Sequence, residues 1–262
     1  MASARAEAER ELAEKMRLER RLRRELRPVE KSVARSTIAS LAASLSIPAD
    51  LEAKAAELSE PVLSNHYRRV SRAFAGRVER DVPEEERLTS TERAGLAVAV
   101  AAALATRAKS SAALYGGASA REAVASVAAV RAEQDRRASA GEPALDRRSF
   151  AVAAGVTLDR RLRSMSAAAA ISETNAPAEL SKASEALALA GGNLERDPLS
   201  KTWVSQGDSD VRPHHLRADG QRVLASEPFR VMGELLMYPL DTSLGATAAN
   251  VSNCRCSAQY SR

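Results

Sequence analysis

The 262-residue chain contains few aromatic residues. Three Phe, four Tyr and one Trp make up 3% of it, whereas β-strands are enriched in aromatic and β-branched residues. Ala, Leu, Glu and Arg are abundant instead, and these small or straight-chain residues lose little conformational entropy in a helix. The composition therefore excludes an all-β domain and predicts a chain that is mostly helical.

Long apolar runs are also absent. The longest, residues 95–105, has 11 residues, about half of the roughly 20 that a membrane-spanning helix needs. We expect a buried helix in this run and a soluble protein without membrane contact. Residues 1–15 carry charges where a signal peptide would have its apolar segment, so we also expect no export signal.

Residues 1–195 show the periodicity of amphipathic helices. Leu22, Leu26, Val29 and Val33, for example, recur at steps of four and three residues, which places them on one helix face. Proline and glycine mark the interruptions. We predict a helical body with a break or kink near residue 28 and further breaks near residues 48, 83, 117 and 141.

The composition changes after residue 195. Four of the eight aromatic residues and both cysteines lie in residues 196–262. Short apolar runs alternate there with turn-like segments such as Ala218-Asp219-Gly220. The predicted fold class is therefore α+β, with a long, mostly helical N-terminal region followed by a small mixed α/β module over 196–262.

This C-terminal module contains several short motifs in a fixed order. They include Lys201-x-Trp203, Asp219-Gly220-Gln221, Glu227-Pro228-Phe229 and Asn253-Cys254-Arg255-Cys256. In this order the module resembles the Mu protein F-like minor head (head morphogenesis) proteins of tailed bacteriophages. The residues that carry the resemblance, called the signature residues below, are Trp203, Asp208, Arg212, His215, Asp219, Gly220, Phe229, Pro239, Asn253, Cys254 and Cys256.

The resemblance implies a structural component of a phage head. Such a protein is made in the bacterial host cytoplasm and resides in the head interior or at the portal vertex. The implied partners are the portal protein, the major capsid or scaffold protein, and packaged double-stranded DNA. The chain has no Walker loop, no G-x-G-x-x-G and no nucleophile motif around Cys254, so we expect a binding protein and not an enzyme.

Three signature residues are also candidate metal ligands. Zinc accepts imidazole and thiolate ligands, which His215, Cys254 and Cys256 would supply, with His214 as a further candidate. Cys254 and Cys256 are too close in sequence for an unstrained disulfide between them. Their C-x-C spacing departs from the C-x-x-C of common zinc knuckles, so zinc is one of two readings that the sequence leaves open.

The other reading is purely structural. The two thiols would then pack against Trp203 or Phe229, and His215 would hydrogen-bond to Asp208 or Asp219.

The remaining signature residues have expected structural roles. Arg212 is expected to tie Asp208 or a nearby backbone carbonyl across a turn. Asp219-Gly220 is expected to form a tight turn before a strand.

The charge of the whole chain is nearly balanced, with 39 Lys and Arg against 34 Asp and Glu. Most of the net +5 lies in residues 1–35, which hold 11 Lys and Arg against seven Glu. Arginines spaced along a helix can neutralise DNA phosphates. The candidate DNA-binding residues are Arg17, Arg20, Arg21, Arg23, Arg24 and Arg27.

Two other interpretations of this basic segment remain. The interleaved glutamates favour a solvated, salt-bridged face or a helix that binds a partner protein. Direct DNA binding, if it is the main activity, would instead make the chain a standalone helical DNA-binding protein with a zinc-stabilised C-terminal domain.

Overall fold

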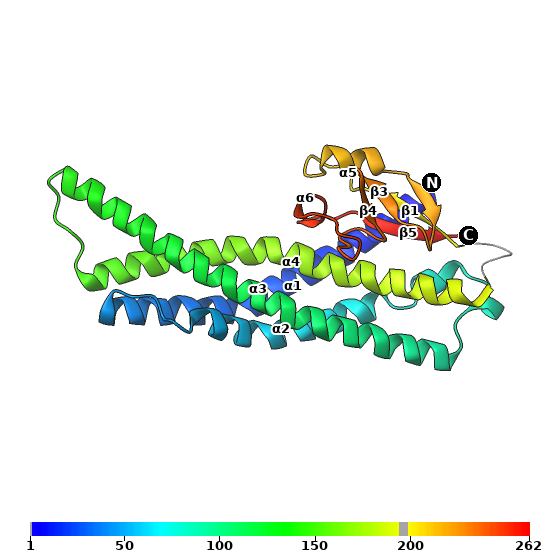
Figure 1. Ribbon diagram of the computed structural model, residues 1–262, viewed down its shortest axis with the longest axis horizontal. Helices are drawn as coiled ribbons and strands as arrows, with labels where there is room; N and C mark the ends of the chain where they lie inside the picture. The colour runs from blue at the N-terminus through cyan, green and yellow to red at the C-terminus, as the bar shows by residue number, and fades with distance from the viewer. Residues whose placement is uncertain (1, 194–198) are drawn as a thin grey trace. The chain divides into compact units, whose positions relative to one another are not determined.

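The computed structural model describes residues 2–193 and 199–262, and four long helices dominate it (Figure 1). They are α1 (Ala2–Ser44), α2 (Leu51–Phe74), α3 (Ser90–Ser139) and α4 (Arg147–Asn193). Two 3-10 turns, η1 (Val78–Asp81) and η2 (Glu84–Glu86), lie between α2 and α3. Short strands and helices follow from residue 200 onward, so the predicted α+β class is confirmed.

Three of the five predicted helix breaks are present. They separate α1 from α2 near residue 48, α2 from α3 near residue 83, and α3 from α4 near residue 141. Gly141 has φ of +74°, the left-handed conformation that commonly ends a helix at glycine. The predicted boundary between residues 195 and 196 lies outside the described residues.

Of the break or kink predicted near residue 28, the break is wrong, because α1 continues through Pro28. A proline inside a helix costs about 3 kcal/mol. Pro28 itself is exposed, whereas Leu26 and Val29 beside it are buried. Packing of the turns on both sides of the proline therefore outweighs its local cost.

The predicted break at residue 117 is also wrong, because α3 continues through Gly116 and Gly117. A Cβ atom at Gly116 would overlap the backbone oxygen of Glu52 on α2 and lie 3.0 Å from the Cβ of Ala56. The glycine is required for the close approach of two helices, not for a helix end.

The apolar run 95–105 is helical, as predicted, but it is not buried. Of its large side chains only Val100 and Leu104 are buried, and Val98 is 71% exposed. One buried position every four residues gives a narrow stripe, and the alanines between them face solvent. Among the described helices, none combines the length and hydropathy needed to cross a membrane.

The described residues form two compact units, each assembled from segments that are distant in sequence. Unit 1 comprises Met1–Arg20, His66–Ala105 and Ala169–Arg262, and unit 2 comprises Arg21–Asn65 and Thr106–Ala168. The C-terminal module therefore shares unit 1 with the first part of α1 and the last part of α4.

Unit 2 consists of helical segments packed around two apolar clusters. One is centred on Leu158 and Leu162, the other on Leu41 and Phe150. A Cβ atom at Gly155 would overlap the side chain of Ile38, so glycine again permits close helix packing.

The strands of unit 1 form two small antiparallel sheets. The first has the order β2-β1-β5 and the second is the hairpin β3-β4. Their bounds are β1 (Ser200–Val204), β2 (Arg222–Leu224), β3 (Phe229–Val231), β4 (Glu234–Leu236) and β5 (Ser257–Ser261). Two short helices, α5 (Pro213–Ala218) and α6 (Ala248–Val251), complete the module.

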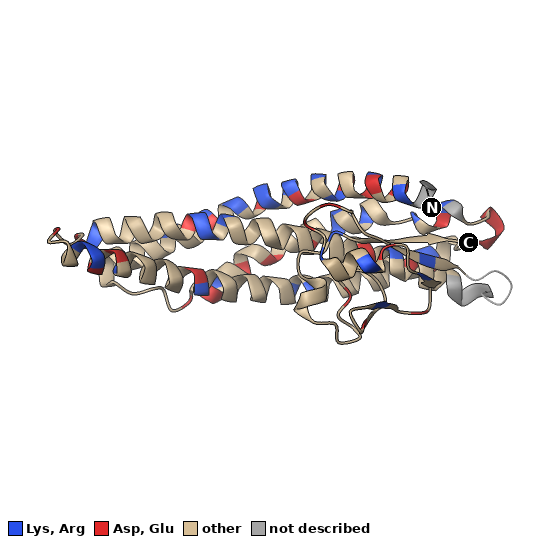
Figure 2. Cartoon of the chain, turned by 90° about the horizontal axis from the view of Figure 1, so that it is seen from above, with Lys and Arg blue, Asp and Glu red and all other residues tan. Residues whose placement is uncertain are grey.

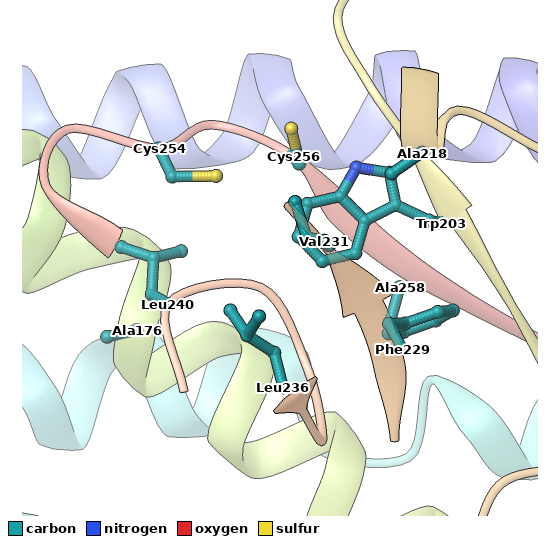
Figure 3. Close-up of a cluster of buried hydrophobic side chains, with 10 residues drawn as sticks. All are labelled: Ala176, Trp203, Ala218, Phe229, Val231, Leu236, Leu240, Cys254, Cys256 and Ala258. Carbon is teal, nitrogen blue, oxygen red and sulfur yellow. The ribbon is translucent and has the colours of Figure 1, made fainter. Parts of the chain in front are cut away.

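One apolar cluster forms the core of this module (Figure 3). Its members are Ala176, Trp203, Ala218, Phe229, Val231, Leu236, Leu240, Cys254, Cys256 and Ala258. The Trp203 ring is fully buried and meets Phe229 edge to face, with 5.3 Å between ring centroids. Trp203 on β1 lies opposite Ala258 on β5, so the sheet brings the two ends of the module together.

Buried ion pairs fasten β5 to α1 and α4. The Nζ atom of Lys15 lies 2.7 Å from a carboxylate oxygen of Glu179, and that of Lys182 lies 2.7 Å from Glu11. All four side chains are at most 2% exposed.

The backbone of β5 is bonded directly into this network. The backbone N–H of Ala258 donates to Glu179, and its carbonyl accepts from Lys182. The side chain of Ser257, one residue after Cys256, bonds to Lys15 at 2.8 Å. The network thereby fixes the segment that carries the two cysteines.

Candidate metal centre

His215, Cys254 and Cys256 come together in unit 1. Cys254 Sγ lies 3.4 Å from His215 Nδ1, and Cys256 Sγ lies 3.6 Å from the same atom. The ligand atoms of all three residues lie within 4.8 Å of one another, and each residue is 2% exposed. The structure thus joins three residues that the sequence predicts as metal ligands.

The distances suit a tetrahedral zinc ion. Zn–S bonds of about 2.3 Å and Zn–N bonds of 2.0–2.1 Å give a sulfur–nitrogen edge of about 3.6 Å in a tetrahedron. Both observed Sγ–Nδ1 distances are close to this value. The two distances are therefore compatible with a metal ion held by both thiols and by Nδ1.

Helix α5 positions the histidine. Pro213 occupies its first turn, where a proline needs no hydrogen-bond partner for its nitrogen and its φ is already helical. His215 lies two residues after Pro213 on the same helix. Its ring packs edge to face on Trp203, with 5.4 Å between ring centroids. This contact aligns the imidazole toward the thiols.

His214 is not part of the cluster. Its ring lies 4.7 Å from that of His215, at 80°. Partial burial and the neighbouring His215 and Arg212 lower the pKa of His214. His214, the further candidate, therefore lies outside the candidate ligand set.

A tight reversal positions the cysteines. Asn253 has a positive φ of +53°, a conformation that asparagine tolerates better than most residues. Its backbone N–H donates to the Ser172 hydroxyl on α4 at 3.1 Å. Cys254 follows at once, and Cys256 immediately precedes β5.

The two thiols share their protons unequally. A hydrogen bond from the Cys256 thiol, aided by His215, outweighs burial and lowers the pKa of Cys254 to about 5. The same interaction with Cys254, together with burial, raises the pKa of Cys256. The interaction between the thiols therefore favours deprotonation of Cys254 over that of Cys256, and a metal ion bound to both would displace their protons.

The predicted hydrogen bond from His215 to Asp208 or Asp219 is absent. Asp219 accepts instead from the backbone N–H of Ser205 at 2.6 Å, and Asp208 accepts from that of Asp210 at 3.1 Å. The other part of the structural reading is present, because both thiols belong to the Trp203 core. The two candidate ligands Cys254 and Cys256 therefore also belong to the packed core.

Arg212 binds a backbone carbonyl, but the prediction of a tie to Asp208 or to a nearby carbonyl across a turn is wrong. Its guanidinium donates to the carbonyl oxygen of Ser252, 40 positions away in sequence. Gly220, with φ of +78°, forms the predicted turn before β2, and its N–H donates to the carbonyl of Trp203. Both residues thus act as structural ties within the module.

Sequence reasoning missed the roles of Lys201, which begins one of the quoted motifs, and of Asp241. The buried Lys201 donates to the carbonyls of Ala225 and Met237, at 3.0 and 2.7 Å. Burial lowers its pKa to about 8. The Asp241 carboxylate accepts the N–H of Met237 at 2.9 Å. Together they hold the loop that contains the buried Pro239. The one hint in the sequence is a charged residue, Lys201, within a segment that forms a buried strand.

A small cavity of about 30 Å³ adjoins the cluster. Besides the three ligands, it is lined by Gln206, Asp208, Asp210, Val211, Arg212, Asn253 and Arg255. Most of this lining is polar. The cavity is large enough for about one water molecule and too small for an organic ligand.

The six candidate DNA-binding arginines lie on α1, where basic and acidic segments alternate (Figure 2). All except Arg27 are exposed. Arg27 binds Glu30 and Asp159, with nitrogen–oxygen distances of 2.6 and 2.8 Å, so its charge is already neutralised within unit 2.

The exposed arginines differ in their partners. Arg17 pairs with Glu14 and Arg21 with Glu25, while Arg23 donates to a backbone carbonyl. Across residues 2–193 and 199–262, no ion pair involves Arg20 or Arg24. These two retain their full charge for an external phosphate.

No protein-family model, no curated protein and no solved structure matches the chain. The resemblance to the Mu F-like proteins therefore rests on the signature residues themselves, from Trp203 to Cys256.

Proposed function

We propose that this protein is a non-enzymatic minor capsid, or head morphogenesis, protein of a tailed phage that binds the portal through its C-terminal module. One observation supports this best. The signature residues Trp203, His215, Phe229, Cys254 and Cys256 are buried together in one core. These residues build a folded unit, which favours a module that acts through its surface.

We further propose that zinc on His215, Cys254 and Cys256 stabilises this module. Its strands have only three to five residues, and a core this small gains much from a metal clamp. The ligand types and the Sγ–Nδ1 distances both suit zinc.

Metal analysis of the full-length protein, purified without chelator, tests the zinc proposal. About one zinc per chain is expected for the wild type. His215→Ala and Cys254→Ser should lose it, whereas the matched control His214→Ala should keep it. Absence of zinc from the wild type, or equal loss in the control, would discard the clamp.

Particle composition tests the head-protein proposal. Peptides of this chain should appear in purified, DNA-filled heads, and the chain should co-purify with the co-expressed portal protein. A phage carrying His215→Ala should give fewer infectious particles than one carrying His214→Ala. The proposal fails if the chain is absent from particles or does not bind portal rings.

Contact with packaged double-stranded DNA is the second part of the proposed function. It is favoured by Arg20 and Arg24, which are exposed and have no ion-pair partner among the described residues. If the chain binds DNA but neither portal, major capsid nor scaffold protein, the standalone DNA-binding alternative replaces the head protein. Gel-shift and portal pull-down experiments on the same preparation distinguish the two.

A further inference from the structure

The cluster supplies one ligand fewer than a closed zinc site needs. Structural zinc ions normally have four protein ligands, whereas sites with an exchangeable ligand have three and an open position. Within the described ranges, the residues that can ligate together at this place are His215, Cys254 and Cys256 only. The fourth position must therefore be filled from the adjoining cavity.

The nearest carboxylates are engaged elsewhere. Asp208 lines the cavity, but one of its carboxylate oxygens accepts the N–H of Asp210, which holds the side chain in its own turn. Neither Asp208 nor Asp210 belongs to the group of ligating atoms within 4.8 Å. The cavity, at about 30 Å³, has room for one water between these residues and the three ligands.

The walls of the cavity carry charges of both signs. Arg212 and Arg255 both line it. Arg212 donates to a neutral carbonyl, so its charge is not cancelled by that contact. Arg255 lies 3.5 Å from a carboxylate oxygen of Glu19, and Asp208 and Asp210 also line the cavity. Two thiolates and a neutral imidazole just balance the charge of Zn²⁺, so Arg212 is the group in this lining that would attract a small anion.

We propose, on the basis of the zinc site proposed above, that the fourth coordination position is open to this cavity and holds a water that small monodentate anions displace. The metal and the small size of the cavity set the chemical class of ligand: a small anion that binds through one donor atom. The protein would thus combine a stabilising metal with an exchangeable coordination position.

Cobalt substitution tests this inference on the full-length protein. Co²⁺ bound to two thiolates and an imidazole has visible absorption bands that report the fourth ligand. Titration with azide should shift these bands in a saturable manner. Asp208→Asn and its matched control Asp210→Asn should keep both the bands and the azide response.

The result that overturns the inference is distinct from failure of the zinc site. If the wild-type bands ignore azide, and Asp208→Asn changes the bands or makes them respond, Asp208 is the fourth ligand and the position is closed. Bands that ignore azide in all variants also overturn an open position. If Co²⁺ gives no thiolate bands at all, the metal centre itself is wrong and the inference falls with it.

Discussion

The Nζ atom of Lys182 lies 2.7 Å from the carboxylate of Glu11, and both side chains are 2% exposed. Lys182 also lies 3.0 Å from Glu179 and donates to the carbonyl of Ala258. One lysine on α4 therefore joins α1 and β5 inside unit 1. Because Ala258 follows Cys256 by two residues, this ion pair also supports the segment that carries the candidate metal ligands.

Lys182→Met should destabilise the protein strongly. Removing one partner of a buried ion pair leaves uncompensated charge and costs about 3–5 kcal/mol. The matched control Lys109→Met removes an exposed lysine and should change the free energy of unfolding by less than about 0.5 kcal/mol. Urea unfolding followed by circular dichroism measures both. Equal effects of the two substitutions would show that the buried network contributes nothing.

Glu11 should make this unit sensitive to acid. Burial alone would raise the pKa of Glu11, but the charges of Lys182 and Lys15 and the hydrogen bond from Lys182 together lower it below its usual 4.5. A carboxyl with a lowered folded-state pKa stabilises the fold above its unfolded pKa, and this contribution is lost as the pH falls through the folded pKa.

Glu11→Gln tests whether Glu11 stabilises the fold at neutral pH and loses this contribution in acid. The wild type should be the more stable of the two at about pH 7, and the difference in unfolding free energy should shrink as the pH approaches about 3. Urea midpoints at several pH values measure it. A difference that stays constant or grows on acidification would contradict the assignment.

The sequence identified three residues that the structure brings together, whereas two of its predicted helix breaks were wrong. His215, Cys254 and Cys256 were identifiable because few residue types bind zinc, and folding brought together residues 39 and 41 positions apart. Pro28 and Gly116 misled the prediction because local propensity cannot register tertiary packing. The buried flanks of Pro28, and the Glu52 backbone against Gly116, decide those positions.

The buried lysines were beyond sequence reasoning for a related reason. Lys15 and Lys182 look like ordinary helix-surface residues in the sequence, since lysine is rarely fully buried. Only the arrangement of β5 against α1 and α4 places Glu179 and Glu11 where they compensate these charges. The same arrangement makes the C-terminal module depend on residues near the N-terminus.

Alanine substitutions at two glycines of α3 should have opposite effects on the stability of the protein. At Gly116 a Cβ would overlap the Glu52 backbone, so overpacking should outweigh the better helix propensity of alanine, for a net loss of about 1–2 kcal/mol. At Gly95 nothing lies within 4 Å of the added Cβ, so the same change should stabilise by about 0.5–1 kcal/mol. Thermal unfolding of the two variants measures this, and a stabilised Gly116→Ala would contradict the close packing.

Two pairs of arginines on α1 can be substituted to distinguish specific phosphate contacts from a general attraction of DNA to positive charge. Arg20 and Arg24 lack ion-pair partners among the described residues, whereas Arg17 and Arg21 pair with glutamates. If α1 contacts DNA, Arg20→Ala with Arg24→Ala should reduce the slope of log affinity against log salt by about 2, because each lost phosphate contact removes about 0.9. Arg17→Ala with Arg21→Ala removes the same formal charge and should change that slope much less. Equal slopes for the two double variants would show that binding follows net charge, and α1 would then have no specific phosphate-contacting residues.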